Sequence, residues 1–277
     1  MKIAFIADAH LVSENDRYKG LHETRGFLKR AWPSFATLLD RVNDESPDVV
    51  LFLGDLVDWF SPDNVNFALD LVNRLQVPWH MTPGNHDLET PQVDFSDTRY
   101  EVRPSQEAAD FWKRQGCDWR PRAIGDETLN VLTFDSSLSG VADGVASWIR
   151  RSIVEGCPNI VGTHVPVSVD AVKDYIVGVD PGRDLKKYVQ SRSPALYPEG
   201  IRNRISHVFT GHLHFPGTVE YESTVFHMLG MSVSIDDHAP ASATIVEATR
   251  SNVEIRKLRA STLSPPNFVS APENRAR

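Results

Sequence analysis

The sequence is poor in cysteine. Cys117 and Cys157 are the only two among 277 residues, and they lie outside any C-x-x-C spacing. Neither a thiolate metal site nor a framework of disulfides is therefore indicated, and a reducing cytoplasm suits this cysteine usage.

Long apolar runs are also lacking at the N-terminus. The run from Ile3 to Ala7 is interrupted by Asp8 and His10. It is too short for the apolar region of a signal peptide or for a membrane span. We expect no membrane contact and no targeting segment, and a cytoplasmic location.

The sequence also lacks an excess of basic residues. The chain has 29 basic and 37 acidic residues, a formal net charge of -8. This charge repels a phosphate backbone, so nucleic acid is disfavoured as a partner. With 41% apolar and 24% charged residues, the composition is that of a globular protein and argues against disordered, collagen-like, coiled-coil and membrane classes.

Short apolar runs, several rich in β-branched residues, predict strands buried on both faces; they span 3–7, 49–53, 77–81, 131–134, 160–163 and 207–210. Apolar residues at helical spacing lie between them, from Phe27 to Val42 and from Val65 to Leu75, and again over 107–114 and 145–154. This alternation indicates an α/β sheet with helices on both faces. The stretches 224–229, 243–248 and 253–258 indicate further β-structure.

No low-complexity linker or internal repeat divides the chain. We interpret residues 1–263 as one domain and the Pro-, Asn- and Arg-rich residues 264–277 as a flexible tail. Residues 166–200 are less regular and contain Arg183, Lys186 and Lys187. They predict either an excursion over an active site or a solvated loop.

Polar side chains follow the ends of five predicted strands, and a glycine lies close to four of these groups. Because the carboxyl ends of parallel strands gather at one edge, we expect these side chains to form one site. Oxygen and imidazole donors without sulfur suit Mn, Fe or Zn, and the donors outnumber the needs of one ion. The groups are Asp8 and His10; Asp55 and Asp58; Asn85, His86 and Asp87; His164; and His212 and His214.

These groups resemble the five sequence blocks of the calcineurin-like metallophosphoesterases, in order and in spacing, over about Ile3 to Gly230. The resemblance implies a four-layer αββα sandwich with a binuclear metal centre at the carboxyl edge of the strands. It implies that two divalent or mixed-valence ions are held, one by Asp8, His10 and His214, the other by Asn85, His164 and His212, with Asp55 bridging them.

By the same resemblance, His86 would protonate the leaving oxygen, and Asp58, less directly Asp87, would hold its imidazole in register. Two such cations acidify a bridging water to hydroxide and stabilise the attacking and leaving oxygens. We expect the aromatic residues to fill the core, with Trp59 or Phe60, next to Asp58, as the exception if any reaches a substrate.

Several substrate classes remain open within the superfamily. His86 stands where lipid pyrophosphatases have arginine, and Trp59 stands where phosphoprotein phosphatases have arginine. A repair nuclease is disfavoured by the acidic charge and by the lack of a C-terminal capping domain. Residues 133–137 and Trp148 resemble bacterial cyclic-nucleotide phosphodiesterase-like (class III) members.

The sequence thus favours a hydrolase of small phosphodiesters. The alternatives are a phosphomonoesterase, a nuclease or a non-catalytic binding protein. The expected partner is a small phosphate ester, and a homo-oligomer is left open.

Overall fold

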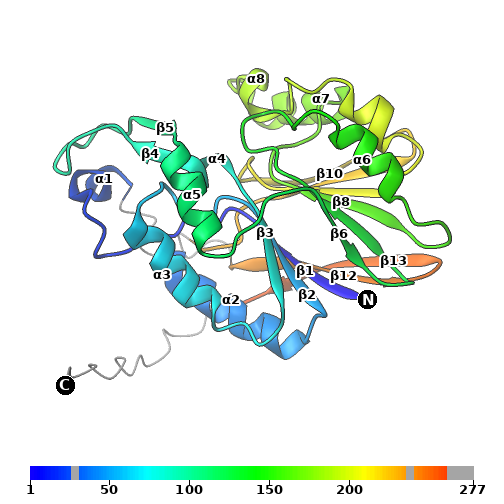
Figure 1. Cartoon of the computed structure of the whole chain (residues 1–277), viewed down its shortest axis with the longest axis horizontal. Helices are drawn as coiled ribbons and strands as arrows, with labels where there is room; N and C mark the ends of the chain where they lie inside the picture. The colour runs from blue at the N-terminus through cyan, green and yellow to red at the C-terminus, as the bar shows by residue number, and fades with distance from the viewer. Residues whose placement is uncertain (26–30, 235–239, 261–277) are drawn as a thin grey trace.

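Two β-sheets form the centre of the computed structural model, which describes residues 1–25, 31–234 and 240–260 (Figure 1). The strands of the first sheet, in spatial order, are β13 (Asn252–Arg259), β12 (Ser242–Thr249), β1 (Lys2–Ile6), β2 (Val49–Leu53) and β3 (Trp79–Thr82). The strands of the second are β10 (Pro216–Tyr221), β11 (Thr224–Leu229), β9 (His207–Thr210), β8 (Asn159–Thr163), β7 (Asn130–Thr133) and β6 (Arg122–Gly125). A small hairpin pairs β4 (Glu89–Pro91) with β5 (Val102–Pro104).

The helices lie outside the two sheets and between successive strands. They are α1 (Lys19–Thr24), α2 (Ala31–Glu45), α3 (Pro62–Val72), α4 (Asn85–Leu88), α5 (Gln106–Arg114), α6 (Val145–Ser152), α7 (Asp170–Val179), α8 (Leu185–Tyr188) and a π-helix (Leu196–Ile201). Helix α3 begins as its sequence predicts, because the Ser61 side chain accepts a hydrogen bond from the Asn64 amide (3.1 Å) and proline occupies the first position.

The sheets pack face to face because their strands are apolar on both sides. In β1, Ile3 and Phe5 point toward the second sheet, and the Phe5 ring stacks on Phe209 with 4.6 Å between centroids. Ala4 and Ile6 point the other way, into the core shared with α2 and α3. Helices α6 and α7 cover the outer face of the second sheet in the same manner.

This arrangement confirms the expected four-layer αββα sandwich. The alternation of strands and helices alone predicted one sheet with helices on both faces, which is wrong. The buried strands are divided between two sheets, so each strand has one face against helices and one against the other sheet.

Parallel pairing places the site. Strands β1, β2 and β3 are parallel, as are β7, β8 and β9. The loops that leave their carboxyl ends therefore meet at one edge of the sandwich.

Two of the sequence expectations fall outside the described residues. These are the tail at 264–277 and the first turn of the helix expected from Phe27, and the described part of that helix is α2. Over the described residues, no helix combines the length and the apolar character that a membrane crossing requires.

Candidate metal centre

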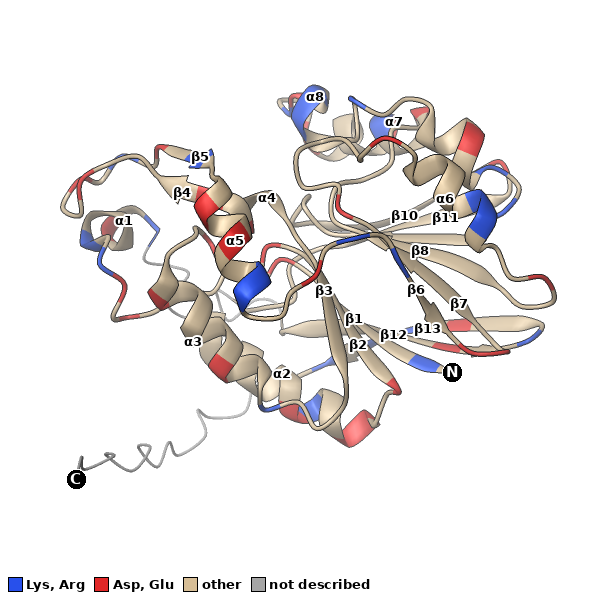
Figure 2. Ribbon diagram, viewed as in Figure 1, with Lys and Arg blue, Asp and Glu red and all other residues tan. Residues whose placement is uncertain are grey.

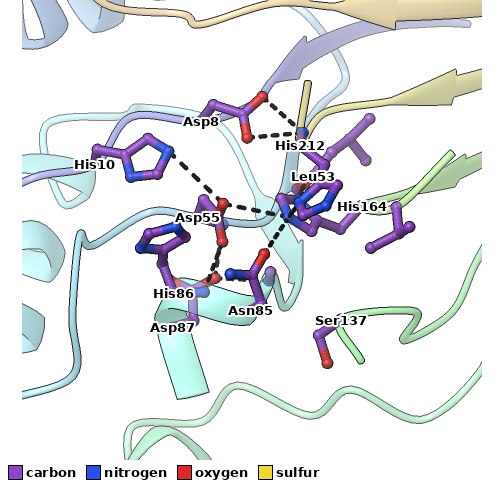
Figure 3. Close-up of polar contacts among 12 residues, drawn as sticks. Asp8, His10, Leu53, Asp55, Asn85, His86, Asp87, Ser137, His164 and His212 are labelled. Atoms are coloured by element: carbon purple, nitrogen blue, oxygen red, sulfur yellow. Dashed lines mark hydrogen bonds and ion pairs between the residues drawn. The ribbon is translucent and has the colours of Figure 1, made fainter. Parts of the chain in front are cut away.

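The structure brings together all the polar groups that the sequence places at strand ends (Figure 3). Asp8 and His10 follow β1, Asp55 follows β2, and α4 carries Asn85 and His86 directly after β3. His164 follows β8, and His212 and His214 follow β9. The first sheet thus supplies the carboxylates and the amide, and the second sheet supplies three imidazoles.

The backbone of these loops is tightly turned. The Asp8 amide donates to the Gly54 carbonyl (3.1 Å) and the His10 amide to the Asp55 carbonyl (2.9 Å), which ties the first two loops together. Nine non-glycine residues in the described part of the chain have positive φ, and five of them are candidate ligands: Asp8, His10, Asp55, His212 and His214. Such a conformation costs on the order of 1–3 kcal/mol per residue, and it is typical of functional sites.

Two glycines are required by close approach. Gly54 has φ +85°, and a Cβ there would lie 2.4 Å from the Gly84 nitrogen. A Cβ on Gly84 would lie 2.0 Å from the Asp55 carboxylate. Only glycine at both positions lets the second and third loops touch beside Asp55.

One donor cluster consists of Asp8, His10, Asp55 and His214, whose ligand atoms all lie within 4.8 Å of one another. The Nε2 atoms of His10 and His214 face each other at 2.9 Å. Two imidazole nitrogens at this distance need a proton or a cation between them.

A second cluster consists of Asp55, His164 and His212, again within 4.8 Å. His164 Nε2 lies 3.1 Å from His212 Nδ1 and 3.4 Å from the Asn85 amide oxygen. Asp55 is common to both clusters, at the position that the resemblance implies for a bridging ligand.

Three of the histidines are oriented through their second ring nitrogen. His10 Nδ1 lies 2.8 Å from the Asp58 carboxylate, His164 Nδ1 lies 2.8 Å from the Leu53 carbonyl, and His212 Nε2 lies 3.1 Å from the Lys187 carbonyl. An acceptor at one ring nitrogen keeps the proton there, and the other nitrogen then presents a lone pair to the site.

The donor set fits cations. Asp55 Oδ2 is buried and makes no hydrogen bond to the described residues, although His164 Nε2 is 3.3 Å and His10 Nε2 is 3.7 Å away. Burial raises the pKa of Asp8 to about 7. Burial opposes protonation of His164, but the Asp55 carboxylate outweighs it and raises the His164 pKa to about 9. Cations between these groups would supply the positive charge that the buried carboxylates lack.

Asp58 contacts His86 differently from the sequence expectation. Its carboxylate accepts from His10 Nδ1 and from the Arg25 guanidinium, and lies 3.6 Å from His86 Nδ1. The main-chain carbonyl of Asp58 is the closer partner of His86 Nδ1, at 2.7 Å. Asp58 therefore orients His86 through its backbone and His10 through its side chain.

Asp87 also has other contacts than those expected. Its two carboxylate oxygens accept four backbone amides, those of Asp55, Leu56, Val57 and Gly84, at 2.8–3.2 Å. Three of these hydrogen bonds, from Asp55, Leu56 and Val57, join the second loop to the third, and the one from Gly84 lies within the third loop. Asp87 is thus a clamp between loops, and no hydrogen bond links its carboxylate to the His86 ring in the described structure.

Sequence reasoning missed three residues of the site. The Tyr100 hydroxyl lies 2.9 Å from His86 Nδ1 and donates to the Asp58 carbonyl, and Arg25 stacks 4.4 Å above the Tyr100 ring. Both come from loops without a motif. Glu89 accepts from the Asn85 amide nitrogen (3.2 Å) and so turns the amide oxygen toward His164; its i,i+4 spacing from Asn85 could have indicated it.

The aromatic expectation was wrong. Trp59 and Phe60 are 0% and 2% exposed and lie in apolar clusters with other side chains, so neither reaches a substrate.

A cavity of about 540 Å³ opens beside the donor clusters. One wall includes Asp55, Asn85 and His86, from the loop after β2 and from α4, and a second wall includes Arg183 and Lys187, from the segment around α8. Residues 166–200 fold as α7, α8 and the π-helix, and they contribute this second wall.

Comparisons with known proteins agree with this geometry. Residues 1–216 match the family model of the calcineurin-like phosphoesterases. The glycerophosphodiester phosphodiesterase GpdQ of Enterobacter lignolyticus is 24% identical over 245 residues, which cover 84% of this chain and 78% of that protein. A Fibrobacter succinogenes protein named probable cyclic nucleotide phosphodiesterase is 21% identical over 239 residues, 85% of this chain and 82% of that protein.

The fold is also similar to that of a solved dimetal phosphatase from Danio rerio. The TM-score is 0.62 at 14% identity, and the match covers 94% of this chain and 99% of that one. At this identity the likeness concerns the fold alone. Together with the family match over most of the chain and the paired His/Asp clusters, it leads to one conclusion: the chain belongs to the calcineurin-like phosphoesterases, and it is a metal-dependent phosphoesterase.

Proposed function

We propose that this phosphoesterase hydrolyses small phosphodiesters at the cavity beside the two donor clusters. The observation that carries the proposal is the pair of clusters sharing Asp55, with His86 on the adjoining cavity wall. The names of the two relatives described above contain the word phosphodiesterase, which supports a diester rather than a monoester as the substrate.

In this proposal the seven donors hold two ions of the Mn, Fe or Zn type. Asp8, His10 and His214 bind one, Asn85, His164 and His212 bind the other, and Asp55 binds both. When bound, such ions acidify water and stabilise the charge of a phosphoryl group during its transfer.

His86 is the proposed general acid. Its Nδ1 faces the Asp58 carbonyl, which keeps a proton on Nδ1 and leaves Nε2 to exchange a proton with the leaving oxygen. Burial lowers the pKa of His86, but the Asp55 and Asp58 carboxylates outweigh burial and raise it. A raised pKa favours the protonated form of His86, which is the form that a general acid requires.

The test of substrate class compares metal-loaded protein on bis(4-nitrophenyl) phosphate, 4-nitrophenyl phosphate and duplex DNA. We expect the highest kcat/KM on the diester. The acidic net charge opposes the long polyanion more than a small monoanion. A higher kcat/KM on the monoester or on DNA would overturn the diester assignment and leave the metal centre standing.

The role of His86 is tested by leaving-group dependence. His86→Ala is expected to slow diesters with an alkoxide leaving group by on the order of 100-fold, and nitrophenyl esters far less, because nitrophenolate needs little protonation. His80→Ala is the matched control, because His80 lies on β3 outside the cavity beside Arg122. Equal losses on both ester types in His86→Ala would refute the acid role.

A further inference from the structure

The wall of the cavity formed by residues 183–192 is cationic, although the whole chain has a net charge of -8. Arg183, Lys187 and Arg192 line this wall. The carboxylates of the lining are Asp55, a candidate metal ligand, and Glu89, which lies with His86 on the other side. Figure 2 shows the basic residues of α8 in blue, in the helical layer above the second sheet.

Two of these cations have no acidic partner in the described structure. Arg183 pairs with Asp180 through Nε (3.0 Å), whereas no carboxylate of the described residues lies within 4.0 Å of the charged groups of Lys187 and Arg192. Both side chains are exposed to the cavity and to solvent. Their charge is therefore available to a molecule that enters the cavity.

The backbone beneath these cations is held against the metal centre. The Lys187 carbonyl lies 3.1 Å from His212 Nε2 and accepts from the Ser139 hydroxyl (2.9 Å). The Arg192 amide donates to the Ser139 carbonyl (3.0 Å). The positions of both Cα atoms are thus set relative to a candidate ligand.

A stack of side chains adds to this support. The Arg183 guanidinium lies 4.3 Å from the centre of the Tyr188 ring, and the Tyr188 ring lies 5.1 Å from that of His212. Tyr188 therefore separates Arg183 from the donor cluster and fills the wall between them. Arg183 lines the cavity but is engaged by Asp180 and Tyr188, so Lys187 and Arg192 are the lining cations without an acidic partner among the described residues.

The two walls predict where each ester group of a bound diester lies. If His86 protonates the leaving alcohol, that alcohol lies against the wall of α4 and Glu89. The retained ester group then lies toward the cationic wall.

We infer that this wall is a subsite for a second anion, and that the enzyme prefers phosphodiesters whose retained alcohol carries a carboxylate or a phosphate. Lys187 and Arg192 are its specificity-determining residues. The inference rests on the proposed phosphodiesterase function and deepens it.

The test uses a series of 4-nitrophenyl phosphodiesters with one leaving group and different retained groups. The retained group is 2-carboxyethyl or 2-phosphonoethyl (anionic), propyl (neutral) or 2-(trimethylammonio)ethyl (cationic). For the metal-loaded wild type we expect kcat/KM about tenfold higher on the anionic esters than on the propyl ester, with the cationic ester lowest. Raising the NaCl concentration from 50 to 500 mM should shrink this preference, because the cations are exposed to solvent.

Lys187→Gln and Arg192→Gln should each reduce the ratio of anionic to neutral kcat/KM about threefold or more. Lys186→Gln is the matched control. Lys186 neighbours Lys187, its side chain is not part of the cavity lining, and the net charge changes equally, so the wild-type ratio should persist.

Binding is measured separately by calorimetry on the metal-loaded protein. 3-Phosphonopropanoate should bind about tenfold more tightly than propylphosphonate, and Lys187→Gln should remove most of that difference. Equal affinities in the wild type would overturn the subsite.

The kinetic results distinguish a failure of the phosphodiesterase function from a failure of the anion subsite. Hydrolysis of none of the diesters would overturn the diesterase function and the subsite together. Hydrolysis of the propyl and cationic esters as fast as the anionic ones would overturn the subsite alone. The subsite would also be overturned if the ratio of anionic to neutral kcat/KM were the same in Lys187→Gln as in Lys186→Gln.

Discussion

Replacing Asp58 by asparagine separates the role of its side chain from that of its backbone. Asp58 is fully buried, and its carboxylate accepts from His10 Nδ1 and from Arg25. Burial opposes the charged form, but the hydrogen bonds from His10 and Arg25 outweigh it and lower the pKa from 3.8 to about 2. A shift of this size corresponds to about 2.5 kcal/mol of native-state stability at neutral pH.

The expected cost of Asp58→Asn is therefore about 2–4 kcal/mol in the metal-free protein, since the charge that Arg25 faces is also lost. Chemical unfolding monitored by circular dichroism measures it. Because the folded pKa lies below the unfolded one, the difference from wild type should be full above about pH 5 and disappear as the pH falls through about 2. Asp40→Asn removes an exposed carboxylate paired with Arg74 and should cost less than about 1 kcal/mol.

The same variant should weaken metal binding by about 10- to 100-fold, because Asp58 orients His10. The steepness of the leaving-group dependence should stay as in wild type, since the backbone carbonyl that faces His86 is retained. Competition with a chelator and a series of leaving groups provide the two measurements. Unchanged metal affinity together with a steeper leaving-group dependence would refute this division of roles.

Three further outcomes are expected. Asp55→Asn should remove most of both metals, measured by elemental analysis, and most activity; full occupancy with undiminished turnover would contradict the shared-ligand assignment. Tyr100→Phe removes the hydroxyl 2.9 Å from His86 Nδ1 and should slow hydrolysis of esters with alkoxide leaving groups about three- to tenfold, with both metals retained. Equal slowing of nitrophenyl esters would argue against a role of Tyr100 in positioning His86. Gly84→Ala places a methyl group against Asp55 and should cost about 3 kcal/mol or more in urea unfolding, whereas Gly116→Ala meets no neighbouring atom within 4 Å and reports only the cost of its positive φ.

The local pattern of residues determined the elements and the candidate donors. The apolar runs in β1, β2 and β8 predicted buried strands, because a strand covered on both faces lacks the alternation of polar and apolar residues. The polar residues directly after them could be placed at one edge, because parallel strands end together. The order and spacing of five blocks then pointed to the family.

The tertiary structure decided which sheet each strand joins and which atom of each residue faces its neighbour. Strands β1 and β8 are both buried and neither alternates polar with apolar residues, so periodicity could not assign them to different sheets. The hydrogen-bond partners of Asp58 and Asp87 depend on the positions of backbone groups, some at positive φ and others in close contact. The residue types alone do not reveal these positions. Tyr100 and Arg192 reach the site from loops whose sequence has no period, because long-range packing alone sets where such loops lie.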